Sequence, residues 1–236
     1  MKLNRPGHAG TLLALAVAMT GLAACGHHPA APAGATSAPP ATRTATASPA
    51  PVPSPTGTVI SARVSYSWHW PNDVSQPGLV AHPVSAPPVP ELVAISAGEH
   101  PRELGGLPYN RLSFTFTRAF PSYQFRFVSS LVSNPSGRTV PLGGKGVLQV
   151  TFRPAQAHSA AGHSSVVTQP PTDLGFTRMV DWAQGGDFEG VLTYGIGVNW
   201  PVAHSNPQFP VRAVEVEKVS AQGQHLYVVA IDIAAG

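Results

Sequence analysis

The chain has 236 residues, only 11% of them charged, and a formal net charge of +3 at pH 7. The positive excess lies before Glu91, because ten Lys or Arg residues balance ten Asp or Glu residues from there to the end. No basic run and no basic strip spaced by aromatics occurs in that balanced part, so composition and charge argue against a nucleic-acid partner.

The first 24 residues have the layout of a secretory signal peptide. Two basic residues precede an apolar run, 11–22, and the tetrapeptide Leu-Ala-Ala-Cys ends at Cys25, the single cysteine of the chain. Small residues in front of this cysteine mark a cleavage point. We therefore predict that segment 1–24 is removed by cleavage between Ala24 and Cys25. The alternative is an ordinary secreted protein with a chance cysteine at its cleavage site.

This tetrapeptide resembles the lipobox of bacterial lipoproteins. The resemblance implies that a diacylglyceryl group alkylates the Cys25 thiol and that the new amino terminus can be acylated, with palmitate as an expected chain. One acyl chain holds a protein only marginally, at about 0.8 kcal/mol per buried methylene, whereas two or more anchor it stably. We expect a protein anchored by lipid on the extracytoplasmic face of the cell membrane, with no thiol left for a disulfide or for catalysis.

The segment that follows, 25–58, is expected to be a disordered tether. After the cysteine it consists almost entirely of Ala, Pro, Thr, Ser, Gly and His. Such a tract cannot bury enough apolar surface to offset the entropy of ordering its backbone. About 33 residues at roughly 3.1 Å each could extend on the order of 100 Å, enough to hold a domain off the membrane and within a cell wall. Ser and Thr beside Pro also fit an O-glycosylated stalk.

The next part, 59–90, contains one predicted strand and a proline-rich lead-in. Large side chains alternate with small or polar ones over 64–70, which is the period of a half-buried strand. Whether this strand belongs to the folded domain or to the tether is left open by the sequence. The predicted organisation of the chain is signal peptide 1–24, lipidated cysteine and tether 25–58, lead-in 59–90, and β domain 91–236.

From Glu91 onward, short apolar runs and alternations separated by turn residues predict strands and no helix. The expected strands cover 92–97, 112–116, 123–127, 147–152, 177–183, 191–198, 211–219 and 226–233. The last of them is apolar on both faces and should lie in the centre of its sheet. The polar segment 154–171 is expected to form a surface loop. The predicted fold class is all-β, either a compact β-sandwich or an open barrel.

Three segments of this β domain follow one another in a recognisable order. They are LVAISAGEH (92–100) with YNRLSF (109–114), PSYQFRF (121–127), and GDFEGV (186–191) with YGIGV (194–198). With the apolar run at the end of the chain, they resemble the AMIN-like domain of bacterial lipoproteins and secreted proteins over about 145 residues. Two features depart from the family pattern: Asn110 stands where the family has an aspartate, and 101–108 is an added stretch.

The resemblance implies an all-β domain related to AMIN modules, which localise cell-wall amidases and other envelope proteins through peptidoglycan binding. It therefore implies binding of cell-wall material, or scaffolding of envelope proteins, without catalysis. The first alternative is a protein-interaction module that holds an envelope enzyme or transporter near the membrane. The second is a hydrolase that acts on wall glycan or peptide.

Five residues are candidate ligand contacts. Asp187 and Glu189 would project to the same side of an extended segment, where two carboxylates could act as acid and nucleophile of a glycosidase. Carboxylates at this spacing beside a Gly-Gly turn are more often solvated loop residues or partners of an arginine. Arg111, beside Tyr109, could clamp a carboxylate such as that of a peptidoglycan stem peptide, or pair with Asp187 or Glu189. Trp182 could stack on a sugar ring or fill the core.

Motifs of the common catalytic and cofactor sites are missing from the sequence. The histidines lack the short spacing of a structural zinc site. No nucleophile elbow, His-Glu-x-x-His motif, phosphate-binding loop or dinucleotide fingerprint occurs either. After the signal segment, no apolar stretch approaches the roughly 18 residues that span a membrane. We expect no catalytic residue, no metal and no cofactor.

Overall fold

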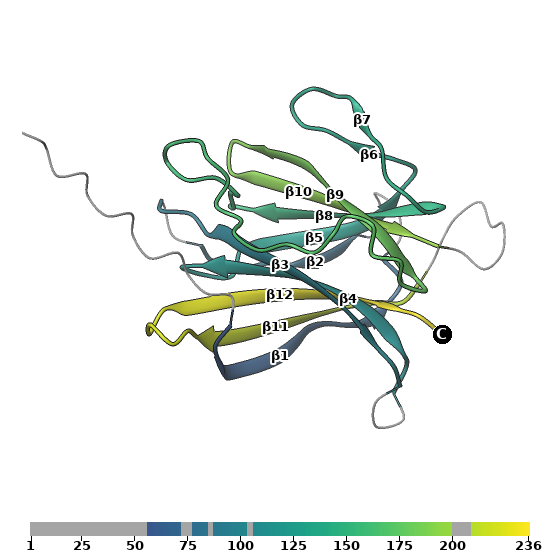
Figure 1. Ribbon diagram of the computed structural model, residues 1–236, viewed down its shortest axis with the longest axis horizontal. Coiled ribbons are helices and arrows are strands. Elements are labelled where there is room, and N and C mark those ends of the chain that lie inside the picture. Colours follow the sequence, from purple (N-terminus) through teal and green to yellow (C-terminus); the bar gives the residue numbers. More distant parts are fainter. Residues whose placement is uncertain (1–55, 72–76, 85–86, 103–105, 200–208) are drawn as a thin grey trace, which may run out of the picture. The chain divides into compact units, whose positions relative to one another are not determined.

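The described part of the chain consists of twelve β-strands, with no helix among them (Figure 1). This computed structural model describes residues 56–71, 77–84, 87–102, 106–199 and 209–236, all of them within the unit Pro49–Gly236. The strands are β1 (Thr58–His69), β2 (Gly78–Val80), β3 (Glu91–His100), β4 (Tyr109–Thr117), β5 (Ser122–Val128), β6 (Leu131–Val132), β7 (Thr139–Val140), β8 (Gly146–Arg153), β9 (Met179–Phe188), β10 (Val191–Val198), β11 (Val211–Val219) and β12 (His225–Ala234). The predicted signal peptide, Cys25 and almost all of the predicted tether lie outside the described residues.

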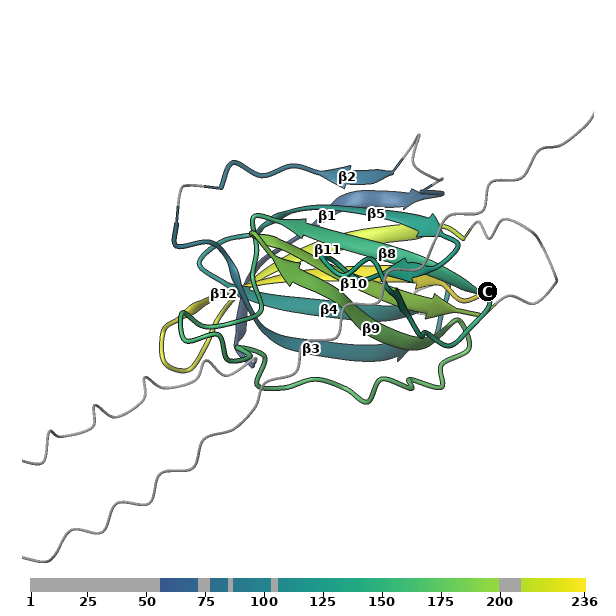
Figure 2. The same ribbon diagram turned by 90° about the horizontal axis from the view of Figure 1, so that it is seen from above.

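Ten of these strands form two five-stranded antiparallel sheets. Sheet A has the order β1-β11-β12-β4-β3, and sheet B has the order β2-β5-β8-β10-β9. The sheets are stacked as two layers, and β6 pairs with β7 in a separate small ribbon (Figures 1 and 2). The prediction of an all-β fold is confirmed, and of its two alternatives the structure adopts the sandwich.

Aromatic side chains from both sheets meet in the core. On β5, strict alternation buries Tyr123, Phe125 and Phe127, as the sequence pattern predicts. Across the interface, the Phe114 ring of β4 lies 4.9 Å from Phe152 of β8, in an edge-to-face contact. Such pairs add to the stabilisation that burial of the ring area already provides.

The strand β12 occupies the centre of sheet A, between β11 and β4. Its side chains are buried on both faces of the sheet from Val228 to Ala234. This confirms the position expected from a run that is apolar on both faces. The central place matters below, because one polar side chain of β12, Asp232, is buried among these apolar ones.

The segment whose place the sequence left open supplies an edge strand to each sheet. In sheet A, β1 pairs with β11 over nearly its whole length, from Thr58 opposite Val219 to His69 opposite Val211. In sheet B, β2 pairs with β5. The lead-in therefore forms part of the sandwich, and the amino-terminal half of β1 remains exposed to solvent.

The expected surface loop 154–171 lies along the free edge of β3 (Figure 2). The Val167 amide donates to the carbonyl of Val93 at 2.9 Å, and the Ile95 amide donates to the carbonyl of Thr168 at 2.9 Å. An edge strand has unpaired backbone groups, and this loop satisfies several of them. The described residues contain no helix long and apolar enough to cross a membrane.

Candidate binding surface on sheet A

The five candidate residues do not converge on one site. Tyr109 and Arg111 lie on β4 in sheet A, whereas Trp182 and Asp187 lie on β9, at the far edge of sheet B. Glu189 follows β9 in the turn that leads to β10. The structure therefore separates the candidates into two groups, which are considered in turn.

Trp182 is a core residue. It is 4% exposed, and its ring centroid lies 6.0 Å from that of Tyr194. Its indole Nε1–H donates to the carbonyl of Pro171 at 2.9 Å, so the one polar group of the side chain is satisfied inside the protein. Stacking on a sugar requires an open ring face, and the expectation of a ligand contact is corrected to a packing role.

Asp187 and Glu189 are not two carboxylates on one extended face. Glu189 and Gly190 have φ values of 49° and 72°, the left-handed conformation at both centres of a two-residue hairpin turn. Asp187 lies before this turn, opposite the core residue Leu192. The expectation that both carboxylates project from one side of an extended segment is therefore wrong, because the chain turns at Glu189. The argument for an acid and a nucleophile of a glycosidase depended on that extended segment.

Asp187 instead holds part of the loop that follows β8. Its Oδ2 accepts a hydrogen bond from the Ala157 amide at 2.9 Å and lies 2.6 Å from Nδ1 of His158. The Asp187 side chain is 12% exposed. Burial raises the pKa of the Tyr194 hydroxyl, and the negative charge of Asp187 raises it further. These contacts hold the loop against β9, so Asp187 has a structural role.

Arg111 binds a carboxylate of the protein itself. Its Nε donates to Oδ1 of Asp232 at 2.6 Å and its Nη2 donates to Oδ2 at 2.9 Å. The fully buried Asp232 also accepts from Nε and Nη2 of Arg212, at 2.9 and 2.6 Å. The predicted pairing of Arg111 with Asp187 or Glu189 is wrong, because Asp232 lies opposite both arginines on the neighbouring strands.

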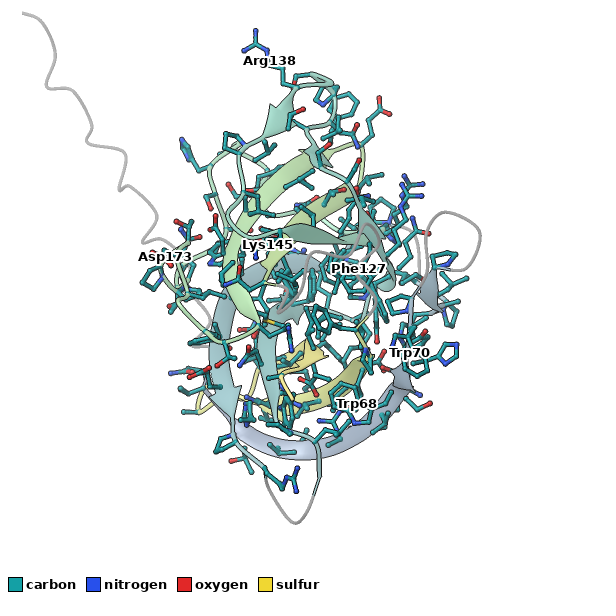
Figure 3. The ribbon with its side chains drawn as sticks, turned by 90° about the vertical axis from the view of Figure 1, so that its right-hand side faces the viewer. Trp68, Trp70, Phe127, Arg138, Lys145 and Asp173 are labelled. Atoms are coloured by element: carbon teal, nitrogen blue, oxygen red, sulfur yellow. The ribbon has the colours of Figure 1, made fainter. Side chains whose placement is uncertain are left out.

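Four planar side chains form a stack across one end of sheet A, which we call the aromatic–arginine ladder. It comprises Trp68, Arg212, Tyr109 and His100, from strands β1, β11, β4 and β3 in that order. The Arg212 guanidinium carbon lies 4.6 Å from the Trp68 ring centroid and 4.8 Å from that of Tyr109. The rings of Tyr109 and His100 stack at 4.6 Å. Figure 3 shows Trp68 far from Arg138 of the β6–β7 ribbon.

A groove of about 310 Å³ lies beside the ladder, on the outer face of sheet A. Small side chains lie opposite one another there: Ser113 of β4 pairs in register with Ala230 of β12, and Thr115 pairs with Val228. Short side chains on four adjacent strands leave the sheet surface hollow. Two charged residues line this outer-face groove, Arg111 and Lys218, and both are cations.

A second buried carboxylate lies between the sheets. Glu215 of β11 is fully buried, and its Oε1 lies 3.0 Å from the Tyr123 hydroxyl, which donates to it, and 2.7 Å from Nε2 of His82. Its Oε2 lies 2.6 Å from Nη2 of Arg63. Burial raises the pKa of Tyr123. Both carboxylate oxygens are satisfied by the protein, so this cluster ties β1, β5 and the lead-in to β11.

The sequence patterns missed the residues that organise the outer face of sheet A. Asp232 and Arg212 lie 20 residues apart in the chain, and His100, although it ends the segment 92–100, has no spacing signal that links it to them. Only the order and register of the strands bring them together. Within the described ranges, no three His, Cys, Asp or Glu side chains lie close enough together to hold a metal ion.

A comparison with models of protein families matches the AMIN-like domain over residues 90–233. The match covers more than half of the chain and runs from the start of β3 almost to the end of β12. It confirms the resemblance seen in the sequence motifs. No similar protein was found among curated proteins, and none among solved structures.

Proposed function

Because the chain belongs to the AMIN-like domain family, we propose that it is a lipid-anchored protein of the cell envelope whose sandwich binds peptidoglycan without catalysing a reaction. The family is associated with peptidoglycan or envelope interactions. In the proposal, Cys25 carries the lipid on the extracytoplasmic face of the membrane. The tether then lets the sandwich reach into the wall.

The observation that carries the binding role is the outer face of sheet A. Two guanidinium groups share one carboxylate at the ladder, so this cluster of Arg111, Arg212 and Asp232 retains one formal positive charge. The half-buried ring of Trp68, at the end of the ladder, lies next to it. Peptidoglycan combines sugar rings, which stack on aromatics, with peptide carboxylates, which arginine binds well. One surface thus offers partners to both parts of the polymer.

The positions of the acidic candidates support a role without catalysis. Asp187 is engaged with His158, and Glu189 is an exposed turn residue. A glycosidase needs two carboxyl groups that flank the scissile bond at about 5 to 10 Å. The turn at Glu189 and Gly190 instead ends the extended segment on which such a pair was expected.

A pull-down on purified peptidoglycan tests the proposed function. The fragment 49–236, which contains the complete described sandwich, should sediment with the insoluble polymer, while serum albumin stays in solution. Trp68→Ala should weaken retention by about threefold to tenfold, which is the contribution of an aromatic contact. Trp70→Ala is the matched control, because Trp70 is exposed nearby but lies outside the ladder. Retention no better than that of albumin would refute peptidoglycan binding.

The exposed part of β1 favours a second candidate function, a protein-interaction module. Val59, Ile60 and Val64 are each more than half exposed, on an edge strand of sheet A. Exposed apolar edge strands are sites where another chain can add a strand. A triple lysine variant at these positions should lose cross-links to an envelope protein in cells and keep its retention on peptidoglycan. Cross-links that survive the substitution would remove this candidate.

A further inference from the structure

We propose that the outer-face groove binds an extended acidic peptide, which is the chemistry of a peptidoglycan stem peptide. This inference rests on the proposed function and assigns one part of the polymer to one part of the surface. It is carried by the shape of the groove, by the charges at its two ends, and by the distance between them.

The shape of the groove suits a peptide backbone. Its lining includes the hydroxyl side chains of Ser96, Ser113, Thr115 and Thr168. A hydroxyl both donates and accepts, so this set can bind the alternating N–H and C=O groups of an extended chain. No aromatic residue is found among the described lining residues, and a groove without aromatics lacks the usual platform for a sugar ring.

The charge of the groove suits an acidic ligand. Its two charged lining residues, Arg111 and Lys218, are both cations, and no carboxylate occurs in the described lining. Arg111 is held in place by Asp232, which orients its planar guanidinium at one end of the groove. Lys218 makes no ion pair with the described residues and lies at the other end. A ligand with carboxylates near both ends would complement this arrangement.

The register of the sheet sets the length of the ligand. Lys218 lies opposite Leu226 of β12, and Arg111 lies opposite Asp232 of the same strand. These two positions are six residues apart, which corresponds to about 20 Å along the strand. An extended peptide of about six residues has the same length, and the flexible Lys218 side chain can reach along the groove toward a shorter one. A short stem peptide therefore fits between the two cations.

Isothermal titration calorimetry with a free stem peptide tests this inference. The probe is the tetrapeptide L-alanyl-γ-D-glutamyl-meso-diaminopimelyl-D-alanine, with its carboxyl-amidated form and a soluble N-acetylglucosamine oligomer as comparisons. The fragment 49–236 should bind the acidic peptide more tightly than either comparison. Lys218→Glu should weaken binding at least about tenfold, because it places like charges together. Lys145→Glu, an exposed lysine outside the groove, is the control and should leave binding unchanged.

A second variant blocks the groove without changing its charge. Ala230→Leu fills the floor and should also abolish peptide binding, provided that circular dichroism shows an unchanged fold. Three outcomes would overturn the inference. They are no binding of the free peptide, peptide binding that Lys218→Glu leaves unaltered, or binding of the sugar oligomer that is tighter than binding of the peptide. If whole peptidoglycan is still retained in those cases, the proposed function stands and only the peptide assignment fails. If whole peptidoglycan is not retained either, both fail.

Discussion

Asp232 and Arg111 face each other across β12 and β4, joined by two hydrogen bonds of 2.6 and 2.9 Å. The carboxylate is fully buried although it lies on the outer face of a sheet. It is enclosed by the two arginines that bind it and by the rings that stack on Arg212. The two arginines give this surface its positive charge, and their positions depend on one buried acid, Asp232.

Asp232→Asn should therefore destabilise the sandwich. The substitution removes the negative charge shared by Arg111 and Arg212, and loss of one partner of a buried ion pair costs about 3 kcal/mol in the free energy of unfolding. Urea denaturation of the fragment 49–236 measures the change. Asp173→Asn is the control, because Asp173 is exposed. Equal urea midpoints for the two variants would show that the ion pairs of Asp232 do not contribute to the free energy of unfolding.

Glu215→Gln should destabilise the protein by about 1.5 to 3 kcal/mol, because the fully buried side chain loses charge-assisted hydrogen bonds to Arg63 and His82. Glu217→Gln, two residues further along β11, is a matched control. Its side chain is 26% exposed and pairs with His225, so its loss should cost less than about 1 kcal/mol. Thermal unfolding of both variants, followed by circular dichroism, compares the two sites. The opposite order of stability would contradict the assignment.

The buried tyrosines predict a loss of stability at alkaline pH. Burial raises the pKa of Tyr123 and Tyr194 in the folded protein, whereas an unfolded tyrosine titrates at about 10. Below pH ~10 both states keep the proton and the full stability is present. Above it only the unfolded state ionises, so the free energy of unfolding falls by about 1.4 kcal/mol per pH unit for each such tyrosine.

Absorbance at 295 nm as the pH is raised measures this effect. Of the five tyrosines, Tyr123 and Tyr194 should ionise only when the chain unfolds, and Tyr194→Phe should reduce the pH dependence of stability. Ionisation of all five near pH ~10 with the fold intact would show that burial does not protect these hydroxyls.

Cys25→Ser should release the protein from the membrane. Serine carries no thiol for the diacylglyceryl group, and the sandwich offers no membrane-spanning helix within its described residues. In cells, the wild-type chain should partition into detergent and incorporate labelled palmitate, and the variant should do neither. Labelling of the variant would disprove attachment at this cysteine.

Strand-level features of the fold follow from local patterns in the sequence. The alternation on β5 and the uniformly apolar β12 are visible without a structure because burial repeats with the pleat of a strand. The short ribbon of β6 and β7 was not predicted, since two-residue strands carry no periodic signal. The pairing of β1 with β11 was left open because it joins residues far apart in the chain, such as His69 and Val211.

The candidate site was predicted only in part. Tyr109 and Arg111 lie on the binding surface, but the acid that orients Arg111 is found only through strand order. Trp182 was a candidate because tryptophan can serve in a core or on a surface, and the sequence does not distinguish the two. Asp187 and Glu189 were candidates because an extended segment was assumed where Glu189 and Gly190 form a tight turn.

The loop along β3 also has a consequence for assembly. It hydrogen-bonds to the first half of β3, whereas β1 at the opposite edge has a strand neighbour on one side only among the described residues. Strand addition to this sheet is therefore favoured at β1, where the edge is open. Two copies could join there edge to edge, and the loop along β3 restricts further growth of the pairing into a filament.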